Sequence, residues 1–124
     1  MSFFEDILSV PGMREKETVR TYEFIEGSLK DLLHLPAHAR PIILKALDDW
    51  LIKSDPQEIT GNKRPLKRTV SGADWYLRKE KWRVLYRVER DEKRTNSLIV
   101  VVGEKFNTKL RVRGKVYAQW QSEA

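Results

Sequence analysis

The stretch that decides the fold is residues 75–86, WYLRKEKWRVLY, in which two runs of aromatic and aliphatic residues flank a charged turn. Both runs are rich in residues that favour β-structure, so we predict strands over residues 74–79 and 81–89 joined by a tight turn. Successive side chains of a strand point to opposite faces. In the second strand, one face receives Trp82, Val84, Tyr86 and Val88, and the other receives Arg83, Leu85, Arg87 and Glu89.

The residues that follow this hairpin continue the sheet. Residues 91–96 form a charged turn, and residues 97–103, SLIVVVG, are almost entirely apolar. That composition is typical of a central strand that is covered on both faces. Residues 104–124 fit either a short strand or a closing helix. Residues 56–72 contain proline, glycine, asparagine and threonine, and they predict a loop.

Before this loop, the sequence predicts one strand and two helices. Residues 19–24, VRTYEF, alternate as a half-buried strand does, and Ser28 is the expected N-cap of a first helix with regularly spaced leucines. A second helix has Pro41 in its first turn and ends at Asp55-Pro56. Its apolar face consists of Ile43, Ala46, Leu47, Trp50 and Leu51.

This order of elements predicts an α+β domain: an N-terminal strand, a helical hairpin, and then a largely antiparallel sheet of three or more strands. The helices are expected to cover one face of the sheet. The other face is expected to expose Arg83 and Arg87, with Arg78 nearby. Residues 1–18 show no steady periodicity and are interpreted as an N-terminal extension, which leaves residues 19–124 as one domain.

Composition excludes several classes of protein. The chain has 124 residues with no cysteine and two histidines, so we expect neither a disulfide, nor a metal site, nor any other cofactor. No apolar run approaches the ~20 residues that a membrane-spanning helix needs. The N-terminus also lacks the basic start and apolar stretch of a signal peptide. We therefore expect a cytoplasmic protein without a membrane partner.

Positive charge is concentrated in the second half of the chain. Residues 1–60 hold 7 Lys/Arg and 11 Asp/Glu, whereas residues 61–95 hold 12 Lys/Arg and 5 Asp/Glu, a net charge of +7. Many of these cations are arginines in or beside predicted strands, interleaved with aromatic residues. This pattern favours a surface for phosphates and bases, although a solvated basic face is the simpler interpretation.

Several stretches resemble the RelE/ParE superfamily of small bacterial toxins. The first is residues 29–36, LKDLLHLP, with ALDDW at 46–50 and Asp55-Pro56, which is similar to the helical hairpin of the family. The second is KRPLK at 63–67, and the third is residues 75–86, which resemble the family pattern YRLRVGDYRVIY without a gap. Residues 101–103, VVG, resemble the valine-rich strand before the family's G-x-R corner, and the resemblance spans residues 19–105.

The resemblance implies a toxin that is neutralised by a cognate antitoxin protein. RelE-like members cleave mRNA on the ribosome without a metal, by attack of a ribose 2′-hydroxyl on the adjacent phosphodiester. The matching positions imply catalytic roles for Arg78, Arg83, Lys105 and Tyr117. Lys67, Lys81, Arg87 and Arg113 would contribute to RNA binding.

Two departures from the family leave alternatives open. The arginine of the family's G-x-R corner falls on Lys105. In the family a Val-Tyr pair follows within several residues, whereas here Val116-Tyr117 stands twelve residues after Lys105. Alternatively, Arg113 is the match, with an insertion after Gly103. The alternative functions are a ParE-like inhibitor of DNA gyrase and a non-catalytic relative that binds nucleic acid. For Tyr117 itself, the simpler interpretation is an anchor for the C-terminal segment.

Overall fold

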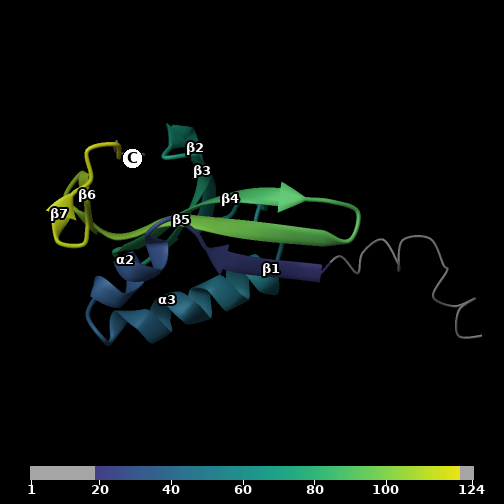
Figure 1. Ribbon diagram of the computed structural model, residues 1–124, viewed down its shortest axis with the longest axis horizontal. Helices are drawn as coiled ribbons and strands as arrows, with labels where there is room; N and C mark the ends of the chain where they lie inside the picture. Colours follow the sequence, from purple (N-terminus) through teal and green to yellow (C-terminus); the bar gives the residue numbers. More distant parts are fainter. Residues whose placement is uncertain (1–18, 121–124) are drawn as a thin grey trace, which may run out of the picture.

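The computed structural model describes residues 19–120, which form the α+β arrangement predicted from the sequence (Figure 1). Strand β1 (Val19–Phe24) is followed by helices α2 (Ser28–His34) and α3 (Ala39–Leu47), and α3 continues into a π-helical turn, η1 (Asp48–Ile52). The remaining strands are β2 (Lys63–Val70), β3 (Ala73–Lys79), β4 (Trp82–Arg90), β5 (Arg94–Phe106), β6 (Lys109–Val112) and β7 (Lys115–Val116). The extension predicted over residues 1–18 lies outside the described residues.

Strand β5 is the central strand of the sheet and pairs with three other strands, β1, β4 and β6. The strand order is β2-β3-β4-β5-β6-β7 with antiparallel neighbours, and β1 pairs in parallel with the first half of β5. The C-terminal end of β5 pairs instead with β6. Most of β5 is buried, so the prediction of a central strand covered on both faces is confirmed.

A bulge bends β5 in its middle. Leu85 on β4 is opposite Val101, but the next residue, Tyr86, is opposite Ile99, so Val100 has no partner on β4. An extra residue of this kind bends the strand and increases its local twist. The bend curls the sheet, and its two faces bury two separate hydrophobic clusters.

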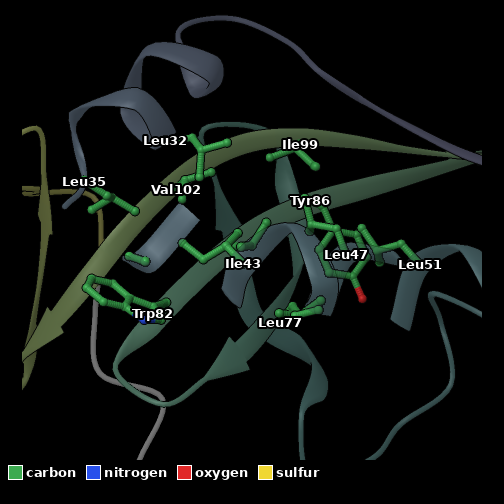
Figure 2. Close-up of a cluster of buried hydrophobic side chains, with 13 residues drawn as sticks. Leu32, Leu35, Ile43, Leu47, Leu51, Leu77, Trp82, Tyr86, Ile99 and Val102 are labelled. Atoms are coloured by element: carbon green, nitrogen blue, oxygen red, sulfur yellow. The ribbon is translucent and has the colours of Figure 1, made fainter. Parts of the chain in front are cut away.

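The first hydrophobic cluster lies between the helices and one face of the sheet (Figure 2). The apolar face predicted for the second helix contributes Ile43, Ala46, Leu47 and Leu51, and β4 contributes Trp82, Val84 and Tyr86. Burying side chains of this size is the main stabilising contribution to the fold, roughly 1.5–3 kcal/mol for each aliphatic residue. The face of β4 that the alternation predicted as apolar is therefore the face that packs on the helices.

The second cluster corrects the expectation that the opposite face of the sheet is open to water. Its members come from the β2–β3 hairpin, β4, β5, β6 and the C-terminal segment: Leu66, Val70, Ala73, Tyr76, Leu85, Val100, Val101, Leu110 and Trp120. The expectation was wrong because the curl of the sheet and the chain after β7 cover this face. Only part of it remains available for charged side chains.

Two predictions of secondary structure are also corrected. Residues 63–70, expected to be loop, form β2, which pairs with β3 at the edge of the sheet. Pro65 is tolerated there because an edge strand has one side without ladder hydrogen bonds. Of the two alternatives for residues after 104, short strands are present in β6 and β7, and no helix forms up to residue 120.

The start of α2 differs from the prediction as well. Gly27 occupies the N-cap position, and the hydroxyl of Ser28 donates a 2.8 Å hydrogen bond to the carbonyl oxygen of Ile99. The predicted Ser28 N-cap is therefore wrong, since this side chain fastens the helix to β5. Pro41 does lie in the first turn of α3, as predicted.

A buried lysine secures the end of the helical segment. The ammonium group of Lys63 donates to the carbonyl oxygens of Trp50 and Asp55, at 3.1 and 2.8 Å, and to the hydroxyl of Ser54 at 2.9 Å. Burial lowers the pKa of Lys63 below its usual value, and the carboxylate of Glu58 opposes this effect. Lys63 is fully buried, so its position in the KRPLK run serves the fold.

Within residues 19–120, no helix combines the length and hydrophobicity that crossing a bilayer requires.

Candidate phosphate-binding site

Three of the predicted catalytic residues lie on one face of the sheet near the β3–β4 turn. Arg78 on β3 and Arg83 on β4 are directly opposite each other, and Arg83 is opposite Gly103 on β5. Lys105 lies two residues beyond Gly103 and therefore on the same face. Diagonal neighbours of this kind have Cα atoms about 7–8 Å apart, within reach of long side chains. We call Arg78, Arg83 and Lys105 the cationic triad.

Arg83 is held firmly in this group and is buried, with 7% of its surface exposed. Its Nη1 donates 2.8 Å hydrogen bonds to the carbonyl oxygens of Glu80 and Trp82, which close the turn. Burial lowers the pKa of its guanidinium, and the charge of Arg78 lowers it further. The expectation of an exposed Arg83 was wrong, because its side chain lies against the turn and bonds to its carbonyl oxygens.

No carboxylate in the described part of the chain compensates the charge of the cationic triad. Within residues 19–120, none of its members forms a salt bridge, and Nε and Nη2 of Arg83 have no hydrogen-bond partner. A guanidinium stays protonated under physiological conditions, so these nitrogens remain available as donors. Like charges directly opposite each other in a sheet are unfavourable, and this arrangement is suited to an anion such as phosphate.

Lys81, predicted to bind RNA, lies beside the triad but is already paired. Its ammonium group is 2.8 Å from a carboxylate oxygen of Glu104 and 5.0 Å from the ring centroid of Trp82. Glu104 and Trp82 are cross-strand partners on the helix side of the sheet. Lys81 therefore points away from the face that carries Arg83.

Tyr117 and Arg113 lie at a different place, a pocket of about 350 Å³. The hydroxyl of Tyr117 is hydrogen-bonded to that of Ser71, in the turn between β2 and β3. Arg113 Nε donates a 2.7 Å hydrogen bond to the buried carboxylate of Asp31, whose other oxygen accepts from the backbone N–H of Val102. The rest of the lining is Glu26, Gly27, Val100, Val101 and Val112.

The structure therefore divides the predicted site into two groups. Ser71 precedes β3 and Arg78 lies near its other end, so about 16 Å of strand separates the hydroxyl partner of Tyr117 from Arg78. The backbone of Tyr117 lies nearer to Lys105, because its N–H donates to the carbonyl oxygen of Leu110, the cross-strand partner of Lys105. The residues between Gly103 and Arg113 form the β5–β6 hairpin, and this places Tyr117 beyond β7. Lys105 is the alternative that joins Arg83, whereas Arg113 joins Asp31.

The last two predicted RNA-binding residues lie toward the β2–β3 turn. A Cβ on Gly72 would lie 3.4 Å from Nη1 of Arg87, so this half-buried guanidinium lies against the turn. Lys67 is exposed on β2, in the same hairpin.

Asp31 and Ser71, which line the pocket beside Tyr117 and Arg113, were not predicted as site residues. A lone acid among helical leucines and a serine in a turn carry no distinctive signal.

Comparisons with known proteins bear on the fold. No protein-family model matches the sequence, and no curated protein matches it significantly. Among solved structures, the chain is similar to one from the crystal structure of the toxin–antitoxin complex RelBE2 from Mycobacterium tuberculosis. The TM-score is 0.53 at 22% identity, and the match covers 71% of this chain and 100% of that chain. At this identity the likeness concerns the fold, and the RelE-like fold predicted from the sequence is confirmed.

Proposed function

We propose that this protein is the toxin of a toxin–antitoxin pair and that it cleaves mRNA on the ribosome, with the cationic triad holding the phosphodiester. The observation that carries the proposal is the uncompensated pair formed by Arg78 and Arg83 on adjacent strands. Such a pair costs the free protein up to about 1 kcal/mol. A bound phosphate converts this repulsion into charge-assisted hydrogen bonds.

The triad is suited to the electrostatic part of the reaction. Attack of the ribose 2′-oxygen on phosphorus expels the 5′-oxygen and leaves a 2′,3′-cyclic phosphate and a 5′-hydroxyl. Negative charge builds up on the phosphate oxygens during this step, and positioned guanidinium groups stabilise it. Lys105 is the triad member that can exchange a proton, since an arginine remains protonated.

The other predicted residues receive supporting roles in this proposal. Arg87 and Lys67 extend the positive field along the β2–β3 hairpin, where an RNA strand leaving the triad would pass. Lys81 and Arg113 contribute less because each is paired with a carboxylate. Tyr117 anchors the C-terminal segment through Ser71 rather than acting as a proton donor.

A cognate antitoxin is the protein partner that this function requires. The similar fold comes from a toxin–antitoxin complex, and an acidic segment that folds as it binds would complement the net charge of +7 over residues 61–95. Co-purification of this chain with the products of the neighbouring open reading frames tests the partner. If neither product binds, the assignment to a toxin–antitoxin pair fails.

Primer extension on a defined mRNA tests the activity, with purified protein added to programmed ribosomes and, separately, to naked RNA. The wild type is expected to cut at the ribosomal A site, and Arg83→Ala is expected to lose the cuts. Arg94→Ala is the matched control, because Arg94 is an exposed arginine at the opposite end of β5. Equal cutting by wild type and Arg83→Ala would exclude the triad as the site.

Inhibition of DNA gyrase is the second candidate. It is favoured by the hydrogen bond that holds the hydroxyl of Tyr117 at Ser71, which leaves the triad without a phenolic acid. A folded protein that cuts RNA in neither setting but blocks DNA supercoiling supports this alternative. In that case Arg83→Ala is expected to retain the inhibition.

A further inference from the structure

An aromatic side chain is exposed where β5 ends. Phe106 has 52% of its surface exposed, and its ring belongs to neither hydrophobic cluster. The guanidinium carbon of Arg111, on β6, lies 4.5 Å from the centroid of the ring. The two side chains thus form a cation–π pair at the surface.

The surroundings of this pair are strongly basic. Residues 105–116 contain five Lys/Arg and no Asp/Glu. Arg113 is engaged by Asp31, but Lys109 and Lys115 are exposed. Figure 1 shows β6 and β7, which carry Lys109 and Lys115, at the end of the molecule away from the β4–β5 turn. We call this end of the molecule the terminal surface.

The strand register places the pair on one face of this terminal surface. Phe106 is opposite Lys109, and Arg111 is opposite Val116 on β7. Lys105, a member of the cationic triad, immediately precedes Phe106 but points to the other face of β5. To reach Phe106, a strand of RNA with one phosphate at Lys105 would pass around the end of the β5–β6 hairpin.

We propose that Phe106 and Arg111 form a stacking platform for an unpaired RNA base that flanks the phosphate held by the triad. This inference rests on the proposed function, since it takes single-stranded RNA as the ligand. Surfaces that bind single strands combine cations for the backbone with aromatic rings for the bases, and arginine adds a further contribution. Every base can stack on an aromatic ring, so the platform strengthens RNA binding without sequence specificity.

The platform is tested with a short single-stranded RNA that carries 2-aminopurine at one position and 2′-O-methyl groups that prevent cleavage. Stacking quenches 2-aminopurine fluorescence, so one titration reports both affinity and stacking. Moving the label along the RNA locates the base on the platform. Wild type is expected to quench the label at one position.

Phe106→Ala is expected to lose the quenching and to bind about 5- to 100-fold more weakly, with the same salt dependence as wild type. Phe106→Trp is expected to restore both properties. Arg111→Gln removes a cation, so it is expected to reduce the slope of log affinity against log salt by about one. Val116→Ala is the matched control, because Val116 is an exposed apolar side chain on the same face.

Failure of the platform is distinguishable from failure of the proposed function. If wild type binds the RNA but Phe106→Ala binds and quenches equally well, the platform is overturned and the triad proposal stands. If Phe106→Ala instead loses only the antitoxin, the ring belongs to a protein interface, which also overturns the platform. If wild type neither binds nor cuts RNA, both proposals fall. Circular dichroism of each variant shows whether the fold is retained.

Discussion

Asp31 and Arg113, 82 positions apart in the chain, are joined by a 2.7 Å hydrogen bond between a buried carboxylate and a half-exposed guanidinium. The bond ties α2 to the turn between β6 and β7. A Cβ on Gly27 would lie 2.5 Å from Nη2 of Arg113, so the glycine leaves room for this guanidinium. Asp31 also binds the backbone of Val102, and it therefore connects the helix, the central strand and the C-terminal hairpin.

Replacing Asp31 with alanine is expected to lower the free energy of unfolding by about 3 kcal/mol. The reason is that the substitution leaves the N–H of Val102 without its acceptor and releases Arg113. Urea denaturation followed by circular dichroism measures the change. Glu92→Ala, which removes an exposed acid from the β4–β5 turn, is expected to change stability by less than about 0.5 kcal/mol. Equal effects of the two substitutions would show that the Asp31 connection contributes nothing.

Gly103→Ala is expected to destabilise the protein by about 1–3 kcal/mol. A Cβ at this position would lie 2.7 Å from the backbone carbonyl oxygen of Arg111, which belongs to the β5–β6 ladder and has little room to move. Gly61→Ala is the matched control, because nothing lies within 4 Å of a Cβ there. Thermal unfolding of both variants checks the prediction, and a Gly103→Ala midpoint as high as that of Gly61→Ala would contradict it.

Arg78→Gln is expected to stabilise the free protein by roughly 0.2–1 kcal/mol, because it removes a like charge directly opposite Arg83. The gain should shrink as salt is added, since screening weakens the repulsion that the substitution removes. RNA binding by the same variant should weaken. Denaturation at low and high salt, together with RNA titration, measures both effects. A variant that loses stability would show that Arg78 is not repelled by Arg83.

Tyr86 is expected to control stability at alkaline pH. Its hydroxyl donates a 2.6 Å hydrogen bond to the carbonyl oxygen of Pro56, and burial, followed by the charges of Asp55 and Asp74, raises its pKa well above the usual value of 10.0. Because the folded pKa is raised, the contribution of Tyr86 is complete below pH 10. Above pH 10, Tyr86 loses its proton in the unfolded chain but keeps it in the folded protein. The free energy of unfolding therefore falls by about 1.4 kcal/mol per pH unit.

Tyr86→Phe removes both the hydrogen bond and the ionisation. It is expected to be less stable than wild type by about 1 kcal/mol at pH 7, and to match or exceed wild type by about pH 11. Denaturant titrations at a series of pH values measure the difference, in which the other ionisations cancel. A constant difference across this range would mean that Tyr86 ionises equally easily in the folded protein.

Alternation predicted β1 and β4 and helical spacing predicted both helices, because each of these patterns reflects burial against one partner surface. Residues that favour β-structure predicted β3, and a continuous apolar run predicted β5, which is covered on both faces. Strand β2 was missed because the proline and charged residues of an edge strand resemble those of a loop. The second cluster was missed for a different reason. Leu66, Leu110 and Trp120 come from separate segments, and only the curled sheet brings them together.

For the candidate site, the sequence by itself determined the chemistry that is available: arginines on an aromatic-rich hairpin, no cysteine, and a concentration of cations after residue 60. Tertiary structure alone decided which of these groups meet. Cross-strand register brings Arg78 to Arg83, whereas the hydroxyl of Tyr117 bonds to Ser71 in the β2–β3 turn. The physical reason is that strand periodicity is encoded locally and survives in one segment, whereas register, bulges and hairpin insertions depend on which distant surfaces are buried together.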